Sequence, residues 1–170
     1  MKESPRAVGP PSRPLRAENQ RRKSRARLNA IRIVIEGRER IADDDLVRAM
    51  LNTVIRRHKT VQWATPAARA LGPKPSRGKR QIDHVIPVQI LIDRLLKGNS
   101  PRAVMDLTEC CYVTRREHSE ALGGFRKDHG DLRKAMQTRP LKDLPELGWD
   151  RYRQAGVKWK AITPITDPEV

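Results

Sequence analysis

Residues 82–88 read IDHVIPV, a short run whose aliphatic residues favour an extended strand and in which Pro87 interrupts regular pairing. Within this run, Asp83 and His84 place a carboxylate directly beside an imidazole. The next stretch, Gln89–Lys97, has the apolar spacing of a helix and ends at a Gly-Asn pair. The sequence therefore predicts a strand that delivers an acid and an imidazole, followed by a helical connection.

A second stretch, ECCYVTRREH, occupies residues 109–118. Its first half predicts another strand, and Thr114 with Glu117 three residues later predicts the capping box of a helix that carries His118. Hard divalent ions bind oxygen or imidazole ligands, and phosphodiester cleavage needs a base to activate water. The two predicted strands, the connection between them and the following helix allow the two stretches to converge. Asp83, His84 and His118 would then supply both the metal ligands and the base.

Helical patterns surround these two stretches. Helices are predicted for residues 28–36, 66–71, 101–105, 131–136 and 147–155. One more predicted helix, the second in the chain, is capped by Asp43 or Asp44 and ends in the basic run from Arg56 to Lys59. The apolar stripe of the second helix consists of Leu46, Val47, Met50, Leu51, Val54 and Ile55. We therefore expect an α+β fold that is mainly α, with a small two-stranded insertion.

The chain has 170 residues and a formal charge of +16, from 36 Lys and Arg against 20 Asp and Glu. This charge favours nucleic acid as the partner, with an anionic membrane surface second. No apolar run is long enough to span a bilayer, and residues 1–27 lack the apolar centre of a secretory signal, which predicts a cytoplasmic protein. Cys110 and Cys111 are adjacent and predict reduced, structural thiols.

Composition divides the chain into four segments. Residues 1–27 are rich in Pro, Ser and Arg and predict a disordered basic arm. Residues 28–72 are predicted to form a helical region that supports DNA binding. Residues 73–125 are predicted to form the core that carries the functional site, and residues 126–170 a C-terminal helical extension and tail.

One family resemblance follows from these motifs. Asp83-His84-Val85-Ile86-Pro87 resembles the Asp-His-aliphatic-aliphatic-Pro signature of the H-N-H endonucleases, which carry a ββα-metal finger. The second half of that family's motif typically runs from Asn to a His or Asn nine positions later, and Glu109 and His118 have this spacing. Glutamate replaces the asparagine. The resemblance covers Gln81 to Leu122 and implies an H-N-H core with an enlarged helical insertion.

The resemblance implies a role for each matched residue. Asp83 and His118 would hold one divalent metal ion, Mg²⁺ or Mn²⁺ first, with Zn²⁺ or Ni²⁺ as alternatives. His84 would be the general base, since a neutral imidazole with an ordinary pKa of about 6.5 can take a proton from water. Three alternatives remain open for Glu109, which occupies the position of the family's asparagine. Glu109 would be catalytic as a further carboxylate ligand of the metal, or its presence would reduce activity. In the third alternative, Asp106 or another polar residue takes the role of the asparagine.

Four basic residues near the motif are candidates for phosphate contacts: Lys79, Arg80, Arg115 and Arg116. The expected function is thus a metal-dependent endonuclease acting on double-stranded DNA, in a phage, mobile-element, restriction or toxin setting. Two alternatives remain open. One is a non-catalytic DNA-binding or regulatory protein with the same fold, and the other is an RNA-directed nuclease.

The remaining histidines and the tryptophans have simpler interpretations. His58 is expected at a helix end and His129 in a loop. Trp63, Trp149 and Trp159 are expected to be core or docking aromatics, because no nucleic-acid-binding motif surrounds them.

Overall fold

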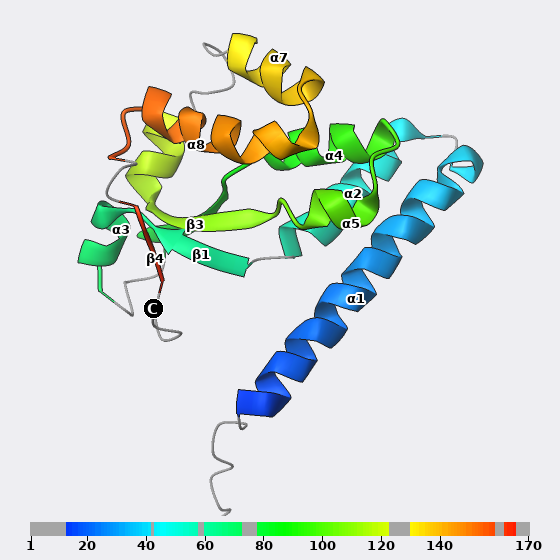
Figure 1. The fold of residues 1–170 in the computed structure, drawn as a ribbon, viewed down its shortest axis with the longest axis horizontal. Helices are drawn as coiled ribbons and strands as arrows, with labels where there is room; N and C mark the ends of the chain where they lie inside the picture. The colour runs from blue at the N-terminus through cyan, green and yellow to red at the C-terminus, as the bar shows by residue number, and fades with distance from the viewer. Residues whose placement is uncertain are drawn as a thin grey trace, which may run out of the picture.

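The computed structural model describes residues 13–41, 43–57, 60–72, 78–122, 130–158 and 162–165. Helices surround a small sheet, and a long first helix extends away from the rest of the molecule (Figure 1). The predicted class, an α+β fold that is mainly helical, is confirmed. The sheet is larger than the predicted two-stranded unit, since it has four strands.

The strands lie in the order β2-β3-β1-β4. Their bounds are Thr60–Ala64 (β1), Arg80–His84 (β2), Glu109–Thr114 (β3) and Thr163–Pro164 (β4). β2 and β3 correspond to the two predicted strands, and they pair antiparallel with Asp83 opposite Cys111. β2 ends at His84 rather than at the predicted Val88, because the chain bends at Val85 and Ile86 and a helix begins at Val88. β1 pairs parallel with the other edge of β3, and β4 pairs antiparallel with β1. β1 escapes prediction because it fills a short gap between two predicted helices.

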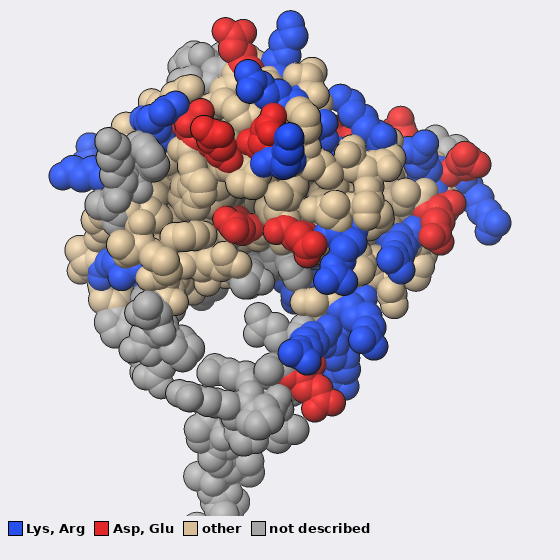
Figure 2. Space-filling model, in the orientation of Figure 1, with Lys and Arg blue, Asp and Glu red and all other residues tan. Residues whose placement is uncertain are grey.

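The first helix, α1 (Arg13–Gly37), corrects the prediction of a disordered arm through Arg27. Pro14 falls in its first turn, where the missing N–H of proline is tolerated. No other Pro or Gly occurs before Gly37, and the intervening sequence is rich in the helix formers Arg, Ala, Leu and Lys. Residues 1–12 lie outside the described part of the chain. The N-terminal half of α1 projects from the body, and its exposed basic side chains form a group at the lower right of Figure 2.

A short 3₁₀ turn, η1 (Arg38–Arg40), leads to α2 (Asp44–Arg57). Asp43 caps α2, because its Oδ1 accepts the backbone N–H groups of Asp45 and Leu46 at 2.9 and 3.0 Å. Val47, Leu51 and Ile55 are buried against α1 and α4, as predicted. Leu46 and Met50, predicted on the same stripe, are exposed because they lie at its outer edge. His58 lies outside the described residues.

The middle of the chain follows the predicted order of elements. It contains α3 (Pro66–Ala70), α4 (Val88–Leu96), α5 (Pro101–Met105) and the segment η2 (Glu117–Leu122). The predicted capping box forms, because Glu117 N–H donates to Thr114 Oγ1 at 3.1 Å and Thr114 N–H donates to Glu117 Oε2 at 2.8 Å. However, η2 is a π-helix rather than an α-helix.

The C-terminal part consists of α7 (Gly130–Thr138), the 3₁₀ turn η3 (Leu141–Asp143) and α8 (Leu144–Gln154). The buried Arg94 of α4 ties α7 in place: its Nε and Nη2 donate to Met136 O at 3.1 and 2.7 Å. These bonds satisfy a carbonyl that the end of a helix leaves without an intrahelical partner.

Two groups of buried side chains form the core. The larger joins α1, α2, α4, α5, α7 and the start of α8, and the smaller lies between the sheet, η2 and α8. Trp63 and Trp149 meet edge to face in this smaller group, with ring centroids 5.5 Å apart, so both are core aromatics as predicted. Trp159 lies outside the described residues. None of the described helices is both long and apolar enough to cross a membrane.

Candidate functional site

The carboxylate of Asp83 is the centre of a buried network at the end of β2. Arg151 of α8 forms an ion pair with Asp83 Oδ2, and Tyr152 Oη donates to the same oxygen at 2.6 Å. The other oxygen, Oδ1, lies 3.3 Å from Nδ1 of His118 on η2. The structure therefore brings together two residues, Asp83 and His118, that the sequence predicts as a pair of metal ligands.

The charge of Asp83 is stabilised despite its burial. Burial by itself raises the pKa of this carboxyl, but the Arg151 guanidinium and hydrogen bonds from His118 and Tyr152 together lower the pKa below its ordinary value. Burial and the nearby Asp83 carboxylate raise the pKa of Tyr152 well above its ordinary value. Tyr152 is therefore a neutral phenol that donates, and Asp83 is an anion that accepts.

The thiol of Cys111 lies opposite Asp83 in the sheet. Burial first, and then the Asp83 and Glu117 carboxylates, raise its pKa to about 12. A protonated thiol is a poor nucleophile and a poor metal ligand. Both cysteines are buried and free of disulfides, as predicted, and the role of Cys111 is to pack beneath the network.

A close backbone approach lets α8 reach β2. A Cβ added at Gly148 would lie 2.9 Å from Val85 Cγ1 and 3.1 Å from Val85 O, so only glycine fits without movement. One helical turn later, Arg151 Nη2 also donates to the backbone oxygen of His84 at 2.6 Å. The last helix thus holds both residues of the Asp-His pair, one by its side chain and the other by its carbonyl.

His118 is held at the site by the start of η2. The carboxylate of Glu117 accepts hydrogen bonds from Thr114 Oγ1 at 3.0 Å and from Thr65 Oγ1 at 2.9 Å, which joins η2 to the end of β1. The side chain of His118 remains 43% exposed, although its Nδ1 atom, which faces Asp83, is buried. π-helical turns are frequent at functional sites because they re-aim one side chain within a helix.

His84 is buried and lines a pocket of about 470 Å³ together with Asp83. Successive strand residues point to opposite faces of a sheet, so these two neighbours lie on opposite faces of β2. Both reach the same pocket because it opens at the end of the strand, where the chain turns into α4. An imidazole and a carboxylate therefore border one space, whereas His118 is not among the residues that line it.

Glu109 lies beside Cys110, the residue that pairs with His84 between β2 and β3. It is the first residue of β3, and its backbone oxygen accepts the N–H of Val85 at 2.9 Å. Among the described residues, its side chain neither contacts Asp83 nor lines the pocket. The nine-residue spacing from Glu109 to His118 thus places the histidine at the site without its partner.

The four predicted phosphate contacts gather at the opposite end of the β2–β3 pair. Arg115 N–H donates to Lys79 O at 2.9 Å, and both side chains are exposed. Arg80 stacks on Tyr112, with its Cζ 4.3 Å from the ring centroid, and Arg116 pairs with Glu120 at 2.8 Å. None of the four lines the pocket.

Arginines from other helices line the pocket instead: Arg56, Arg133 and Arg151. Sequence reasoning missed all three, together with Tyr152. Arg56 and Arg133 lie on α2 and α7, far from the motif in the chain, and no local pattern marks them. Arg151 and Tyr152 lie on α8, and no local pattern marks them either, because the burial of an arginine depends on tertiary packing.

Asp83 and His118 are the residues of this centre that could hold a hard cation. In the part of the chain that the structure describes, no cluster of three or more His, Cys, Asp or Glu side chains is placed to share a metal ion. A cation between Asp83 Oδ1 and His118 Nδ1 would have these two protein donors and would replace the direct contact between the two atoms. Mg²⁺ and Mn²⁺ are commonly bound by few protein groups and complete their shells with water and phosphate oxygens.

Comparisons of this chain with models of protein families, with curated proteins and with solved structures give no match.

Proposed function

We propose that the protein is a metal-dependent endonuclease that hydrolyses phosphodiester bonds in DNA. The observation that carries this proposal is the contact between Asp83 and His118 across the β2–β3–η2 unit. Asp83 also lines one pocket together with His84. The same three residues are those that the H-N-H resemblance assigns to the metal site and the base.

Each residue has a defined part in the proposed reaction. Asp83 and His118 would hold the cation, and when bound it supplies Lewis-acid stabilisation to the phosphate and the leaving oxygen. His84, in its neutral form, would take a proton from the attacking water. Arg151 and Tyr152 keep Asp83 anionic and oriented through its second oxygen, which leaves Oδ1 facing His118.

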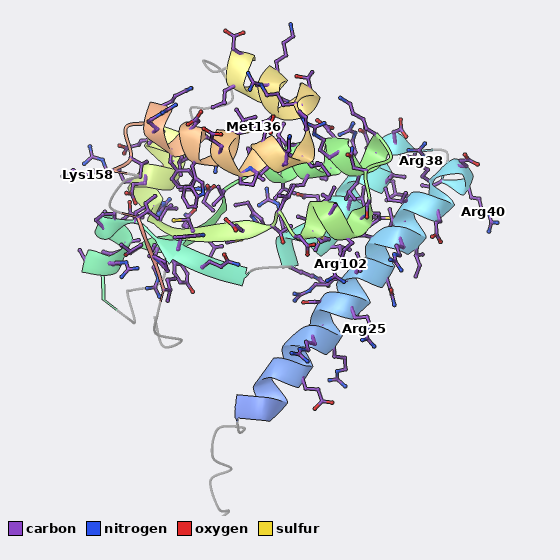
Figure 3. The ribbon with its side chains drawn as sticks, viewed as in Figure 1. Arg25, Arg38, Arg40, Arg102, Met136 and Lys158 are labelled. Atoms are coloured by element: carbon purple, nitrogen blue, oxygen red, sulfur yellow. The ribbon has the colours of Figure 1, made fainter. Side chains whose placement is uncertain are left out.

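The charge distribution supports a nucleic-acid substrate. Exposed Arg21, Arg22, Lys23 and Arg25 line the projecting half of α1, and in Figure 3 the side chain of Arg25 points away from the body. A basic helix of this kind can lie along a phosphate backbone and add affinity that depends on salt rather than on sequence. It would serve as a rigid arm for duplex capture.

A second candidate is a DNA-binding protein that retains the fold without cutting. The observation that favours it is the ion pair of Asp83 with Arg151, because a neighbouring cation opposes metal binding to the same carboxylate. The absence of Glu109 from the pocket lining points the same way. An RNA-directed nuclease is a third candidate, since the charge is compatible with either nucleic acid.

The deciding experiment incubates the full chain with duplex DNA, single-stranded DNA and RNA of one sequence, with Mg²⁺ or Mn²⁺ and with EDTA. The proposal expects metal-dependent cleavage of duplex DNA that stops in EDTA. Binding to DNA with no cleavage under either metal would support the non-catalytic candidate. Preferential cleavage of RNA would support the third.

A further inference from the structure

The pocket beside Asp83 and His84 has both charged and apolar side chains in its lining. A nucleotide likewise combines a charged phosphate with a less polar sugar and base. Its charged lining consists of Arg56 from α2, Arg133 from α7 and the buried Arg151, together with the Asp83 carboxylate that Arg151 neutralises. Its apolar lining consists of Ile82, Pro87, Val88, Ile90 and Leu122. A volume of about 470 Å³ is within the range of pockets that hold small organic ligands and exceeds the need of a lone phosphate ion.

Arg56 and Arg133 are presented for an external anion. Both side chains belong to exposed residues, and no ion pair within the described ranges involves either of them. Asn52 Oδ1 accepts the Nε–H of Arg56 at 2.9 Å, which orients the guanidinium on the surface of α2. Two arginines from different helices at one pocket can bind a phosphate from two sides.

The start of α4, which also lines the pocket, adds a weaker preference for an anion. Residues 87–90 include the first turn of α4, which carries no acidic side chain. The N–H groups and dipole at the start of a helix favour negative charge. The aliphatic side chains next to this turn offer an uncharged surface for a sugar or a base.

We propose that this pocket binds one nucleotide unit of a nucleic-acid strand, with Arg56 and Arg133 on its phosphate and the aliphatic wall against its sugar and base. The inference rests on the proposed function in taking nucleic acid as the partner. It goes beyond that function by assigning substrate contacts to two arginines outside the motif. A pocket of this size takes a nucleotide that is unpaired or splayed from its partner strand.

Calorimetry on the full chain in EDTA tests the proposal without any cleavage. Thymidine 3′,5′-bisphosphate is the probe, with thymidine and inorganic phosphate as its two parts. We expect the bisphosphate to bind more tightly than either part, because each part contacts one side of the pocket. Arg56→Ala and Arg133→Ala should each weaken its binding by about tenfold, the usual loss for a hydrogen bond between charged groups.

Arg102→Ala is the matched control, since Arg102 is an exposed arginine on α5 away from the pocket (Figure 3). It should leave binding of the bisphosphate unchanged. Absent binding, or equal losses in Arg56→Ala and Arg102→Ala, would overturn the proposal. Inorganic phosphate binding as tightly as the bisphosphate would overturn the assignment to a nucleotide. If the predicted arginine dependence appears but no nucleic acid is cleaved with any metal, the proposed function fails and this inference stands.

Discussion

The Oδ1 oxygen of Asp83 lies 3.3 Å from Nδ1 of His118, although one belongs to a strand and the other to the helix after the next strand. The opposite oxygen of the same carboxylate is taken by Arg151 and Tyr152. The two oxygens of Asp83 thus have different partners. Oδ2 binds the structural groups Arg151 and Tyr152, and Oδ1 faces His118, the other proposed metal ligand.

This division predicts how metal binding responds to His118→Ala. The variant removes one of the two donors while leaving Asp83 fixed by α8, so affinity for Mn²⁺ should fall by about tenfold or more. Electron paramagnetic resonance of free Mn²⁺ measures the affinity. Ser119→Ala, on the same helix and exposed, is the control and should bind as the wild type does. Equal affinity in both variants would remove His118 from the metal site.

Arg151→Met should be strongly destabilising. The side chains of Arg151 and Asp83 are only 6% and 8% exposed. The variant therefore leaves the buried Asp83 carboxylate without its positive partner, which should lower the free energy of unfolding by about 3–5 kcal/mol. Arg153→Met, on the same helix, breaks an exposed pair with Asp150 and should cost about 1 kcal/mol or less. Urea denaturation measures both, and equal losses would contradict a structural role for the buried pair.

The lowered pKa of Asp83 predicts a dependence of stability on acid. The folded state binds a proton to this carboxyl less readily than the unfolded chain does, so its contribution is complete above the unfolded pKa of about 3.9. This contribution to stability is lost as the pH falls from the unfolded pKa of Asp83 through its lower pKa in the folded protein. Asp83→Asn cannot titrate, so its free energy of unfolding should fall less steeply below about pH 4 than that of the wild type. Parallel pH profiles would contradict the prediction.

Gly148→Ala should loosen the docking of α8. The added methyl group would lie 2.9 Å from Val85 Cγ1, and relieving that overlap should cost about 1–3 kcal/mol, more than the gain of up to about 1 kcal/mol in helix propensity. Gly37→Ala is the control, because its added Cβ meets no atom within 4 Å and its φ of −84° suits alanine. Thermal unfolding compares the two, and a stabilised Gly148→Ala protein would refute the close approach.

The elements nearest the motif could be predicted from sequence because their signals are local. The strand at Asp83, the helix at Val88 and the Thr114–Glu117 capping box each depend on a few neighbouring residues, and together they place His118. For residues 13–27 the prediction of disorder is wrong, because a basic, polar composition is compatible with both a disordered segment and an exposed helix. Exposed helices need no apolar stripe.

The rest of the site could not be predicted because it depends on packing between distant segments. Arg151 and Tyr152 come from a C-terminal helix that carries no chemical motif, and they reach Asp83 only because Gly148 allows α8 to approach β2. Arg56 and Arg133 join the pocket from α2 and α7. Such contacts follow from the tertiary arrangement, and a single sequence contains no periodicity that reports them.

Cleavage of supercoiled plasmid DNA by the wild type and by His84→Ala tests the central claim most directly. With Mg²⁺ or Mn²⁺, the account predicts nicking by the wild type and a loss of about 10²-fold or more in the variant, the usual contribution of a general base. DNA binding in EDTA should be the same for both proteins, and His58→Ala is the control histidine variant. Equal rates for His84→Ala and the wild type, or no nicking by the wild type with either metal, would contradict the account.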